Sequence, residues 1–421
     1  MSCKNCKSRS LKKIINIGNQ PLSSHFYTKK KHKLKNYSLD LYVCQKCNLI
    51  QFKSLPKLDD MYGLNYGYRT SLSPLMIDHM KNKFLKNKND LIKKKKSNIL
   101  DIGCNDGTFL NFFKKFRNVN LYGIDPSAEK FKQYHSKKIN LIIDYFEKKK
   151  IQEKYKNINF DLITSFAMFY DIEDPNSFCK DINKLLTKNG KWILELSYFP
   201  LLLQNLTYDQ ICHEHVTYYT LTTFENIIKK NGLKILDFNL NNINGGSIEI
   251  ICSKKNSRHS PNTEKIDIQK NFEKNINEQS YQNFNRRVSN IKKTLNLFLE
   301  KNKGDVIGYG ASTKGNIVLN HCGIKSEKLK YICDANPYKF NRFTPGSNIR
   351  IISKKKMRIL KPKFLLVLIW SFRKEVIQQE KTFLNKGGKL IFHLPIFHIV
   401  DKSNYKKYVK SNFNSMSYSI N

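Results

Sequence analysis

The sequence predicts an α/β protein of several domains, and three observations support this fold class. The chain has 421 residues, more than one ordinary hydrophobic core accommodates, so two or three domains are expected. Apolar strand-like runs alternate with amphipathic helical stretches from residue 99 to about residue 252, and again from residue 305 to about residue 400. Such alternation is typical of a parallel sheet covered by helices. Hydrophobic residues make up 40% of the chain, which suffices for buried cores and excludes global disorder.

The chain is strongly basic, with 75 Lys and Arg against 34 Asp and Glu and a formal net charge of +41. A basic stripe would favour a nucleic acid as partner. The lysines are instead spread along the whole chain among many Asn and Ile residues. We therefore do not expect nucleic acid to be the partner.

No segment has the features of an export signal or of a membrane span. The first ten residues, MSCKNCKSRS, are polar. The longest purely apolar run, Phe364–Trp370, is far shorter than the roughly 20 residues of a transmembrane helix. The ten cysteines then indicate reduced thiols, acting as metal ligands, buried hydrophobes or reactive groups. We expect a cytoplasmic protein with no membrane partner, and the sequence leaves its oligomeric state open.

Changes in composition divide the chain into five parts. Residues 1–75 carry two cysteine pairs and a Tyr-rich segment, and residues 76–255 carry the first alternation of strands and helices. Residues 256–303 begin as a polar linker and continue as a helix with apolar residues at three-to-four spacing. Residues 304–405 form a second α/β domain, and residues 406–421 form a tail rich in Lys, Asn and Ser.

Two C-x-x-C motifs form the most specific pattern near the N-terminus. The first consists of Cys3 and Cys6, and the second of Cys44 and Cys47. Each tight turn can aim two thiolates at one point, and four thiolates suit a tetrahedral zinc site. A redox-active dithiol is the alternative. Since four protein ligands leave no coordination position open, we expect the zinc ion to be structural.

A second motif, NILDIGCNDGTFL from Asn98 to Leu110, joins an apolar strand to a helix through a glycine-containing turn. Such a turn lets a ligand lie against the backbone at the carboxyl end of a strand. The next strand ends in Asp125, at the position where such folds hold a ribose by its hydroxyl groups. The order of glycines and acidic residues predicts a class I S-adenosylmethionine (SAM) methyltransferase, with a nucleotide-free α/β domain as the alternative. The candidate cofactor-binding residues are Asp101, Gly103, Asn105, Gly107, Asp125 and Asp144.

A third motif, DQICHEHVTYY, runs from Asp209 to Tyr219. Histidine and glutamate side chains together can move a proton, and a tyrosine hydroxyl can hold an oxyanion. The two histidines are two residues apart and do not form the H-E-x-x-H metal motif. A solvated polar loop is the alternative. Further on, the stretch NGGS at Asn244–Ser247 indicates another close approach of the backbone to a ligand.

Taken in order, these motifs resemble the three-part sugar C-methyltransferases, whose best-known members methylate C-3 of dTDP-4-keto-deoxysugars. The resemblance runs from Cys3 to about Pro395 and also includes GYGASTKGN at Gly308–Asn316. It implies a zinc-binding N-terminal domain, a central class I SAM domain with a Rossmann-like fold and a C-terminal Rossmann-like α/β domain. It also implies a SAM-dependent enzyme that acts on a nucleotide sugar bound between the last two domains.

The resemblance implies roles for individual residues. Glu214 and His215 match the Glu and His of the family's active site, and one tyrosine of the segment holding Tyr62, Tyr66 and Tyr68 enters that site; we favour Tyr68. The expected mechanism is removal of a proton α to the ketone by His215, oriented by Glu214. A tyrosine hydroxyl, from Tyr68 or Tyr219, would then hold the enolate oxygen.

The sequence also departs from the family. Cys212 stands where the family usually carries a Tyr, and the stretch around Asp171 lacks the family's active-site His. The acceptor atom therefore stays open, and O- or N-methylation, an RNA acceptor and a non-catalytic scaffold are the alternatives. In the C-terminal domain, the turn at Gly308–Gly315 either cradles part of the substrate or is purely structural.

Overall fold

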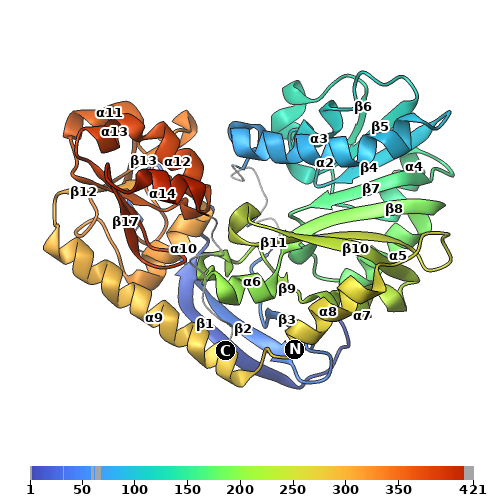
Figure 1. The fold of residues 1–421 in the computed structure, drawn as a ribbon, viewed down its shortest axis with the longest axis horizontal. Helices are drawn as coiled ribbons and strands as arrows, with labels where there is room; N and C mark the ends of the chain where they lie inside the picture. The colour runs from blue at the N-terminus through green and yellow to red at the C-terminus, as the bar shows by residue number, and fades with distance from the viewer. Residues whose placement is uncertain (1, 32, 58–60, 62–67, 412–421) are drawn as a thin grey trace.

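The computed structural model describes residues 2–31, 33–57, 61 and 68–411. Within them, the chain forms three sheets, one for each predicted domain. Figure 1 shows the central domain on the right and the C-terminal domain on the left, with the N-terminal strands beneath both. No helix of the described residues has both the length and the apolar character that crossing a bilayer requires.

The N-terminal sheet has four strands, one of which comes from the central part of the chain. In spatial order they are β1 (Leu11–Pro21), β2 (Asn36–Cys44), β3 (Ile50–Phe52) and β9 (Thr217–Tyr218). All neighbours pair antiparallel, with Leu11 opposite Cys44 and Ile50 opposite Tyr218. The two cysteine pairs therefore flank a long antiparallel hairpin and not an irregular loop. The sheet also joins the first domain to the segment that follows the H-E-H motif.

The central domain is built on a seven-stranded sheet. Its spatial order is β10 (Leu233–Asn241), β11 (Ser247–Lys254), β8 (Leu186–Ser197), β7 (Phe160–Phe166), β4 (Ser97–Ile102), β5 (Val119–Ile124) and β6 (Ile139–Ile142). β11 runs antiparallel to both of its neighbours, and the other pairs are parallel. The predicted α/β fold class is confirmed, and the carboxyl ends of β4, β5 and β7 meet at one edge.

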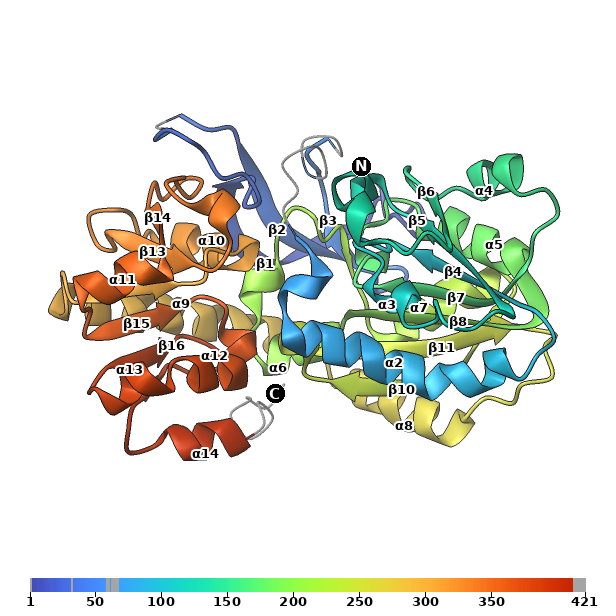
Figure 2. The same cartoon turned by 90° about the horizontal axis from the view of Figure 1, so that it is seen from above.

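Helices cover both faces of this sheet, as a parallel sheet requires. The longer ones are α2 (Pro74–Ile92), α4 (Lys148–Lys154), α5 (Pro175–Leu185) and α7 (Leu221–Lys230), and the short ones are α3 (Thr108–Asn111) and α6 (Phe199–Gln204). The 3-10 helices are η1 (Thr70–Leu72), the longer η2 (Pro126–Tyr134), η3 (Phe169–Asp171), η4 (Tyr208–Gln210) and η5 (Ile243–Gly245). Figure 2 shows α2 lying lengthwise along the sheet.

The C-terminal domain repeats the plan with six strands, of which only β17 runs antiparallel to its neighbour among the described residues. In spatial order they are β14 (Arg350–Ser353), β13 (Tyr331–Asp334), β12 (Val306–Tyr309), β15 (Phe364–Val367), β16 (Lys389–Phe392) and β17 (His398–Val400). Its helices are α10 (Thr313–Cys322), α11 (Lys354–Leu360), α12 (Arg373–Gln379), α13 (Lys381–Asn385) and α14 (Tyr405–Lys410), with η6 (Pro337–Lys339) and η7 (Trp370–Phe372).

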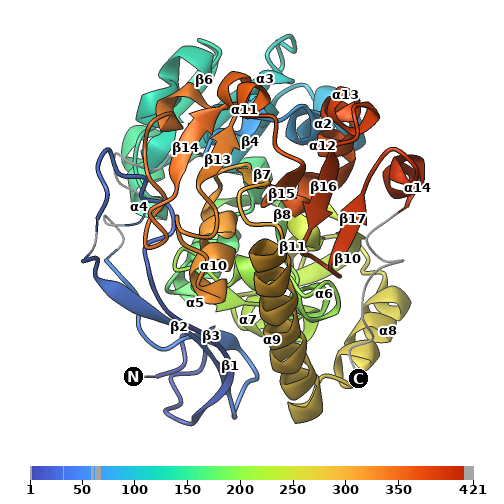
Figure 3. The same ribbon diagram turned by 90° about the vertical axis from the view of Figure 1, so that its left-hand side faces the viewer.

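Two helices, α8 (Thr263–Glu273) and α9 (Glu278–Lys301), connect the two α/β domains. The buried face of α9 carries Val288, Ile291, Leu295 and Leu299 at the predicted spacing. Asn285 of α9 donates a hydrogen bond to the carbonyl of Ile14 in β1 at 2.9 Å. Figure 3 shows α9 in front of the N-terminal strands and below α10. Buried residues of β1–β3, α9 and the C-terminal sheet belong to one hydrophobic core, so the N-terminal and C-terminal domains are packed together.

Candidate active site

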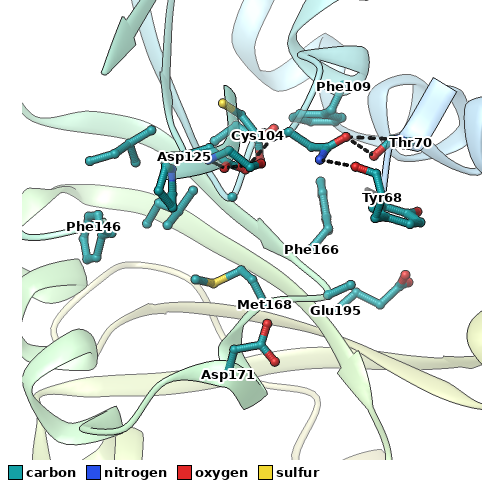
Figure 4. A pocket seen from close by; sticks show the side chains of 18 of the residues that line it. Tyr68, Thr70, Cys104, Phe109, Asp125, Phe146, Phe166, Met168, Asp171 and Glu195 are labelled. Atoms are coloured by element: carbon teal, nitrogen blue, oxygen red, sulfur yellow. Dashed lines mark hydrogen bonds between the residues drawn. The ribbon is translucent and has the colours of Figure 1, made fainter. Parts of the chain in front are cut away.

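A cavity of about 330 Å³ opens at the carboxyl ends of β4, β5 and β7. In Figure 4, Asp125 and Phe146 lie at one end of it and Tyr68 and Glu195 at the other, with Met168 between them. Each of the six predicted cofactor-binding residues except Gly107 lines this cavity. It is therefore the predicted crevice at the carboxyl edge of the sheet.

The turn after β4 is shaped by positive backbone angles and by Asp125. Gly103 and Gly107 have φ values of +74° and +72°, which residues with a side chain rarely adopt. A Cβ on Gly107 would also come within 2.7 Å of the His135 ring. Asp125 accepts a hydrogen bond from the backbone N–H of Asn105 at 2.8 Å and another from that of Ser127 at 2.6 Å. Asp125 thus holds the turn in place from the neighbouring strand.

Asp101 and Asp144 contribute two very different carboxyl groups to the cavity. Asp101 is buried at the end of β4 and accepts a hydrogen bond from the Thr164 hydroxyl at 2.6 Å. Burial raises the pKa of Asp101 to about 7, because a carboxylate loses its hydration there. Asp144 lies at the rim and accepts a hydrogen bond from Lys150 at 2.8 Å, which lowers its pKa.

The far end of the cavity is lined by Tyr68 and Glu195. Tyr68 lines the cavity with 47% of its surface exposed, and desolvation raises the pKa of its hydroxyl to about 12. Glu195 is buried and 2.8 Å from Nε2 of His79 and 2.7 Å from Nζ of Lys83. Burial alone would raise the pKa of Glu195, but these two partners outweigh it and lower the pKa to about 2.

The sequence did not predict this network of charged side chains, which joins α2 to the central sheet. Lys83 also pairs with Glu249 of β11, and Asn241 donates to the second oxygen of Glu195 at 2.8 Å. The one signal in the sequence is an acidic residue near the carboxyl end of β8, where Glu195 lies within the strand. Its partners His79 and Lys83 are more than a hundred positions away in the chain.

The H-E-H segment lies between η4 and β9, and its two histidines face different neighbours. The His213 ring meets the Tyr37 ring of β2 edge-on, with centroids 5.7 Å apart. The His215 ring lies 4.1 Å from that of Tyr170, whose neighbour Asp171 lines the cavity. His215 is therefore next to the cavity although it is not part of its lining.

The environment of His215 favours the neutral imidazole. Burial, followed by the positive charge of Lys314, lowers its pKa to about 3. A ring N–H donates to the carbonyl of Gln210, and Nδ1 has no hydrogen-bond partner among the described residues. The protonated nitrogen is thus Nε2, and Nδ1 carries a buried lone pair.

The remaining predicted residues lie as follows. Glu214 is buried beside the two histidines, whereas the Tyr219 side chain packs in the central core, 5.2 Å from the Phe169 ring, and its hydroxyl accepts from Thr217 at 2.9 Å. Tyr219 does not line the cavity. Tyr62 and Tyr66 lie outside the described residues.

The four N-terminal cysteines form a compact sulfur cluster. Their Sγ atoms all lie within 4.8 Å of one another, with Cys3 and Cys47 at 3.4 Å and Cys6 and Cys44 at 3.5 Å. Tetrahedral zinc with bonds of about 2.3 Å requires sulfur separations of about 3.8 Å, so the four thiols fit this ion. The hydrogen bond from Cys47 lowers the pKa of the Cys3 thiol to about 5.

The two knuckles have the same backbone geometry. Lys7 and Asn48, which follow the second cysteine of each pair, have φ values of 60° and 59°. Each donates its N–H to the carbonyl of the first cysteine at 2.9 Å. Since the turns themselves fix the sulfur positions and four ligands complete the shell, the zinc ion is structural.

Three protein-family models match the chain in succession. A zinc binding domain model matches residues 3–62, a methyltransferase domain model residues 76–237, and a C-methyltransferase C-terminal domain model residues 242–395. Together with the sheet order and the cavity beside Asp125, they define a class I SAM-dependent methyltransferase that binds zinc.

One relative matches over almost its whole length. The C-methyltransferase NovU of Streptomyces niveus is 24% identical over 406 residues, which cover 93% of this chain and 95% of NovU. The three matches in succession and this relative support a SAM-dependent C-methyltransferase with a zinc-binding, a methyltransferase and a C-terminal domain in that order.

Other similar proteins match a smaller part. The tRNA U34 carboxymethyltransferase of Campylobacter jejuni is 29% identical over 128 residues, which cover 27% of this chain and 41% of that protein. The solved structure of PH0226 from Pyrococcus horikoshii covers 45% of this chain and 95% of its own, at 17% identity and a TM-score of 0.35.

Proposed function

We propose that this enzyme methylates a carbon atom of a nucleotide-linked ketosugar in the cytoplasm. The observation that carries the proposal is the buried Nδ1 of His215, which has no partner among the described residues and lies beside the SAM cavity. A base with its lone pair held in a dry site is what removal of a carbon-bound proton requires.

The cofactor is expected to lie across the glycine turn. Asp125 holds the two ribose hydroxyls, because its carboxylate ends β5 and lines the cavity. Gly103, Asn105 and Gly107 present backbone to the ligand, while Asp101 and Asp144 bind at the inner end and at the rim. SAM, when bound, supplies an electrophilic methyl group.

The chain's own residues then perform the acceptor chemistry. His215 takes the proton α to the ketone on Nδ1, and the Gln210 carbonyl keeps the required tautomer in place. Glu214, the next residue in the chain, is buried and is expected to orient the His215 ring. The Tyr68 hydroxyl is a donor in the cavity wall, and its raised pKa keeps it protonated.

The charge of the cavity argues against an RNA acceptor. Its described lining includes six acidic residues and no Lys, Arg or His. Such a lining suits the positive sulfonium of SAM and a neutral carbonyl, and it disfavours a phosphate backbone. The acidic residues are Asp101, Asp125, Asp144, Asp171, Glu173 and Glu195.

The test is methyl transfer from labelled SAM to a panel of nucleoside-diphosphate 4-ketosugars, with NMR to locate the new methyl group. We expect at least one panel member to gain a methyl group on a carbon next to the ketone. Label on an oxygen or a nitrogen, or transfer to none of the panel, would overturn the proposal.

A further inference from the structure

Lys314, within the GYGASTKG turn of the C-terminal domain, lies at the start of a helix that packs against η4, just before the H-E-H segment. Lys314 is the second residue of α10, whose first turn is capped by the Ser312 side chain accepting from the Gly315 N–H at 2.9 Å. The same helix packs against η4, where the Tyr208 hydroxyl is 3.7 Å from the Cys322 sulfur. A second contact joins the domains, because Trp370 donates to Asp209 at 2.8 Å.

The electrostatic effects of Lys314 fall on three residues of the motif. Its positive charge lowers the pKa values of His215, Cys212 and Asp209, although burial raises that of Asp209 to about 6 overall. Burial in turn lowers the pKa of Lys314, and the charge of Asp209 opposes this effect. No direct ion pair joins Lys314 to Asp209 in the described structure, so the ammonium group can bind a ligand.

The same place contains buried polar atoms without partners. Oδ1 of Asp209 and Nδ1 of His215 have no hydrogen-bond partner among the described residues, and the two residues are 1% and 8% exposed. Buried polar atoms are normally satisfied, so unsatisfied ones that meet at a domain interface indicate a ligand.

The surrounding charges select a neutral group over a diphosphate. In the described part of the chain, Lys314 is the cation whose charge affects the pKa values of His215, Cys212 and Asp209. The negative charges of Asp171 and Glu214 act on Cys212 in the opposite direction. Asp209 adds a third acidic residue to these two. Three acidic residues around one lysine would repel a diphosphate. A ketone carbonyl is not repelled by these residues, because it carries no charge until the reaction begins.

We propose that Lys314 binds the carbonyl oxygen of the acceptor and stabilises the negative charge that forms there when His215 removes the neighbouring proton. This inference rests on the proposed function and adds to it a catalytic residue from the C-terminal domain. It also gives the GYGASTKG turn a role in catalysis.

The α proton moves to Nδ1 of His215, the C–H electron pair forms a C=C bond, and the carbonyl π pair moves to the oxygen beside Lys314. The enolate carbon then bonds to the methyl carbon of SAM, the sulfur–carbon bond breaks with its electron pair kept by sulfur, and the carbonyl re-forms. The proton on His215 is released to water.

The experiment measures enolisation separately from methylation. The wild type and the Lys314→Met, Lys314→Arg and Lys325→Met variants are each incubated in D₂O with S-adenosylhomocysteine and the ketosugar that the wild type methylates. Exchange of the α proton is followed by NMR, and SAM affinity by calorimetry. Lys325, exposed just after α10, is the matched control.

We expect Lys314→Met to lower the rate of α-proton exchange at saturating ketosugar at least a hundredfold, with SAM affinity unchanged. Lys314→Arg should recover part of this rate, and Lys325→Met should exchange as fast as the wild type. Unchanged exchange at saturation in Lys314→Met would overturn the inference. A raised KM with unchanged exchange would instead make Lys314 a diphosphate ligand and also overturn it. If the wild type exchanges and methylates none of the ketosugars, the proposed function itself fails.

Discussion

Tyr218, three residues after His215, pairs with Ile50 of the N-terminal sheet in an antiparallel ladder. The next pair, Gln51 with Thr217, is tied to the first knuckle, because the Lys4 N–H donates to the Gln51 side chain at 2.8 Å. Strand β3 therefore connects the sulfur cluster to the segment that carries the proposed base.

Loss of zinc should loosen this connection. We expect metal analysis to find about one zinc ion per chain, and Cys44→Ser to lose it, with a lower Tm and lower turnover but nearly unchanged SAM affinity. Cys252→Ser, in the core of the central domain, is the control that alters a buried thiol yet keeps the metal. Metal-free protein that melts and turns over like the wild type would rule out a structural zinc ion.

Asp125 should control SAM affinity. A hydrogen bond to a charged group contributes about 1.5–3 kcal/mol, so Asp125→Asn should weaken SAM binding about ten- to a hundredfold in calorimetry. The Asn variant keeps the side-chain shape and can still accept from the Asn105 N–H, but its amide nitrogen cannot accept from the Ser127 N–H. Asp144→Asn, at the exposed rim, should have a smaller effect. Equal effects of the two substitutions would contradict the assignment of the ribose to Asp125.

His215 and His213 offer a matched pair for testing the base. His215→Gln should lower turnover by about 10²–10⁴-fold, the usual share of general-base catalysis, while SAM still binds. His213 contacts Tyr37 of the N-terminal sheet, so His213→Gln should mainly lower the Tm. If the His213 variant loses more turnover than the His215 variant, the proton goes elsewhere.

Lys83 should be essential for the stability of α2 on the sheet. It is buried between Glu195 and Glu249, so Lys83→Met leaves Glu195 with His79 alone and Glu249 with the exposed Lys86 at 3.9 Å. Breaking a buried ion pair in this way costs about 3–5 kcal/mol of unfolding free energy, measurable by urea denaturation. Adding Glu249→Gln should restore part of it. A Lys83→Met protein as stable as the wild type would show that the network contributes nothing.

His393 should make the folded protein sensitive to acid. Burial and then the charge of His398 lower the His393 pKa to about 3, whereas an unfolded histidine titrates at about 6.5. Below about pH 6.5 the unfolded chain binds the extra proton, so stability falls as the pH decreases toward the folded pKa. His393→Leu should reduce the stability lost between pH 7 and 5.5 by about 1 kcal/mol. An identical pH dependence of the two proteins would contradict this.

Several features could be predicted because they depend on short stretches of chain. A knuckle such as Cys3–Cys6 fixes two sulfurs within one turn, and the step from β4 to Gly103 is set by local backbone angles. The distance from that turn to Asp125 follows from the regular geometry of neighbouring parallel strands. These constraints do not require knowledge of how the domains pack.

The surroundings of the H-E-H motif could not be predicted in the same way. Tyr219, directly after β9, packs in the core with Phe169, although it is only four residues from His215. Glu195 meets His79 and Lys83 across more than a hundred residues, and no spacing in the sequence signals that contact.

The sequence by itself determined the domain order, the four sulfur ligands, the glycine turn after β4 and the fold class, because local geometry and the periodicity of apolar residues encode them. Only the tertiary structure decided that β9 joins the zinc-binding domain and that Lys314 comes close to His215. These contacts depend on how α9 and the N-terminal sheet pack against the C-terminal core. That packing is a sum of many small, non-directional apolar contacts, and no single motif in the chain records it.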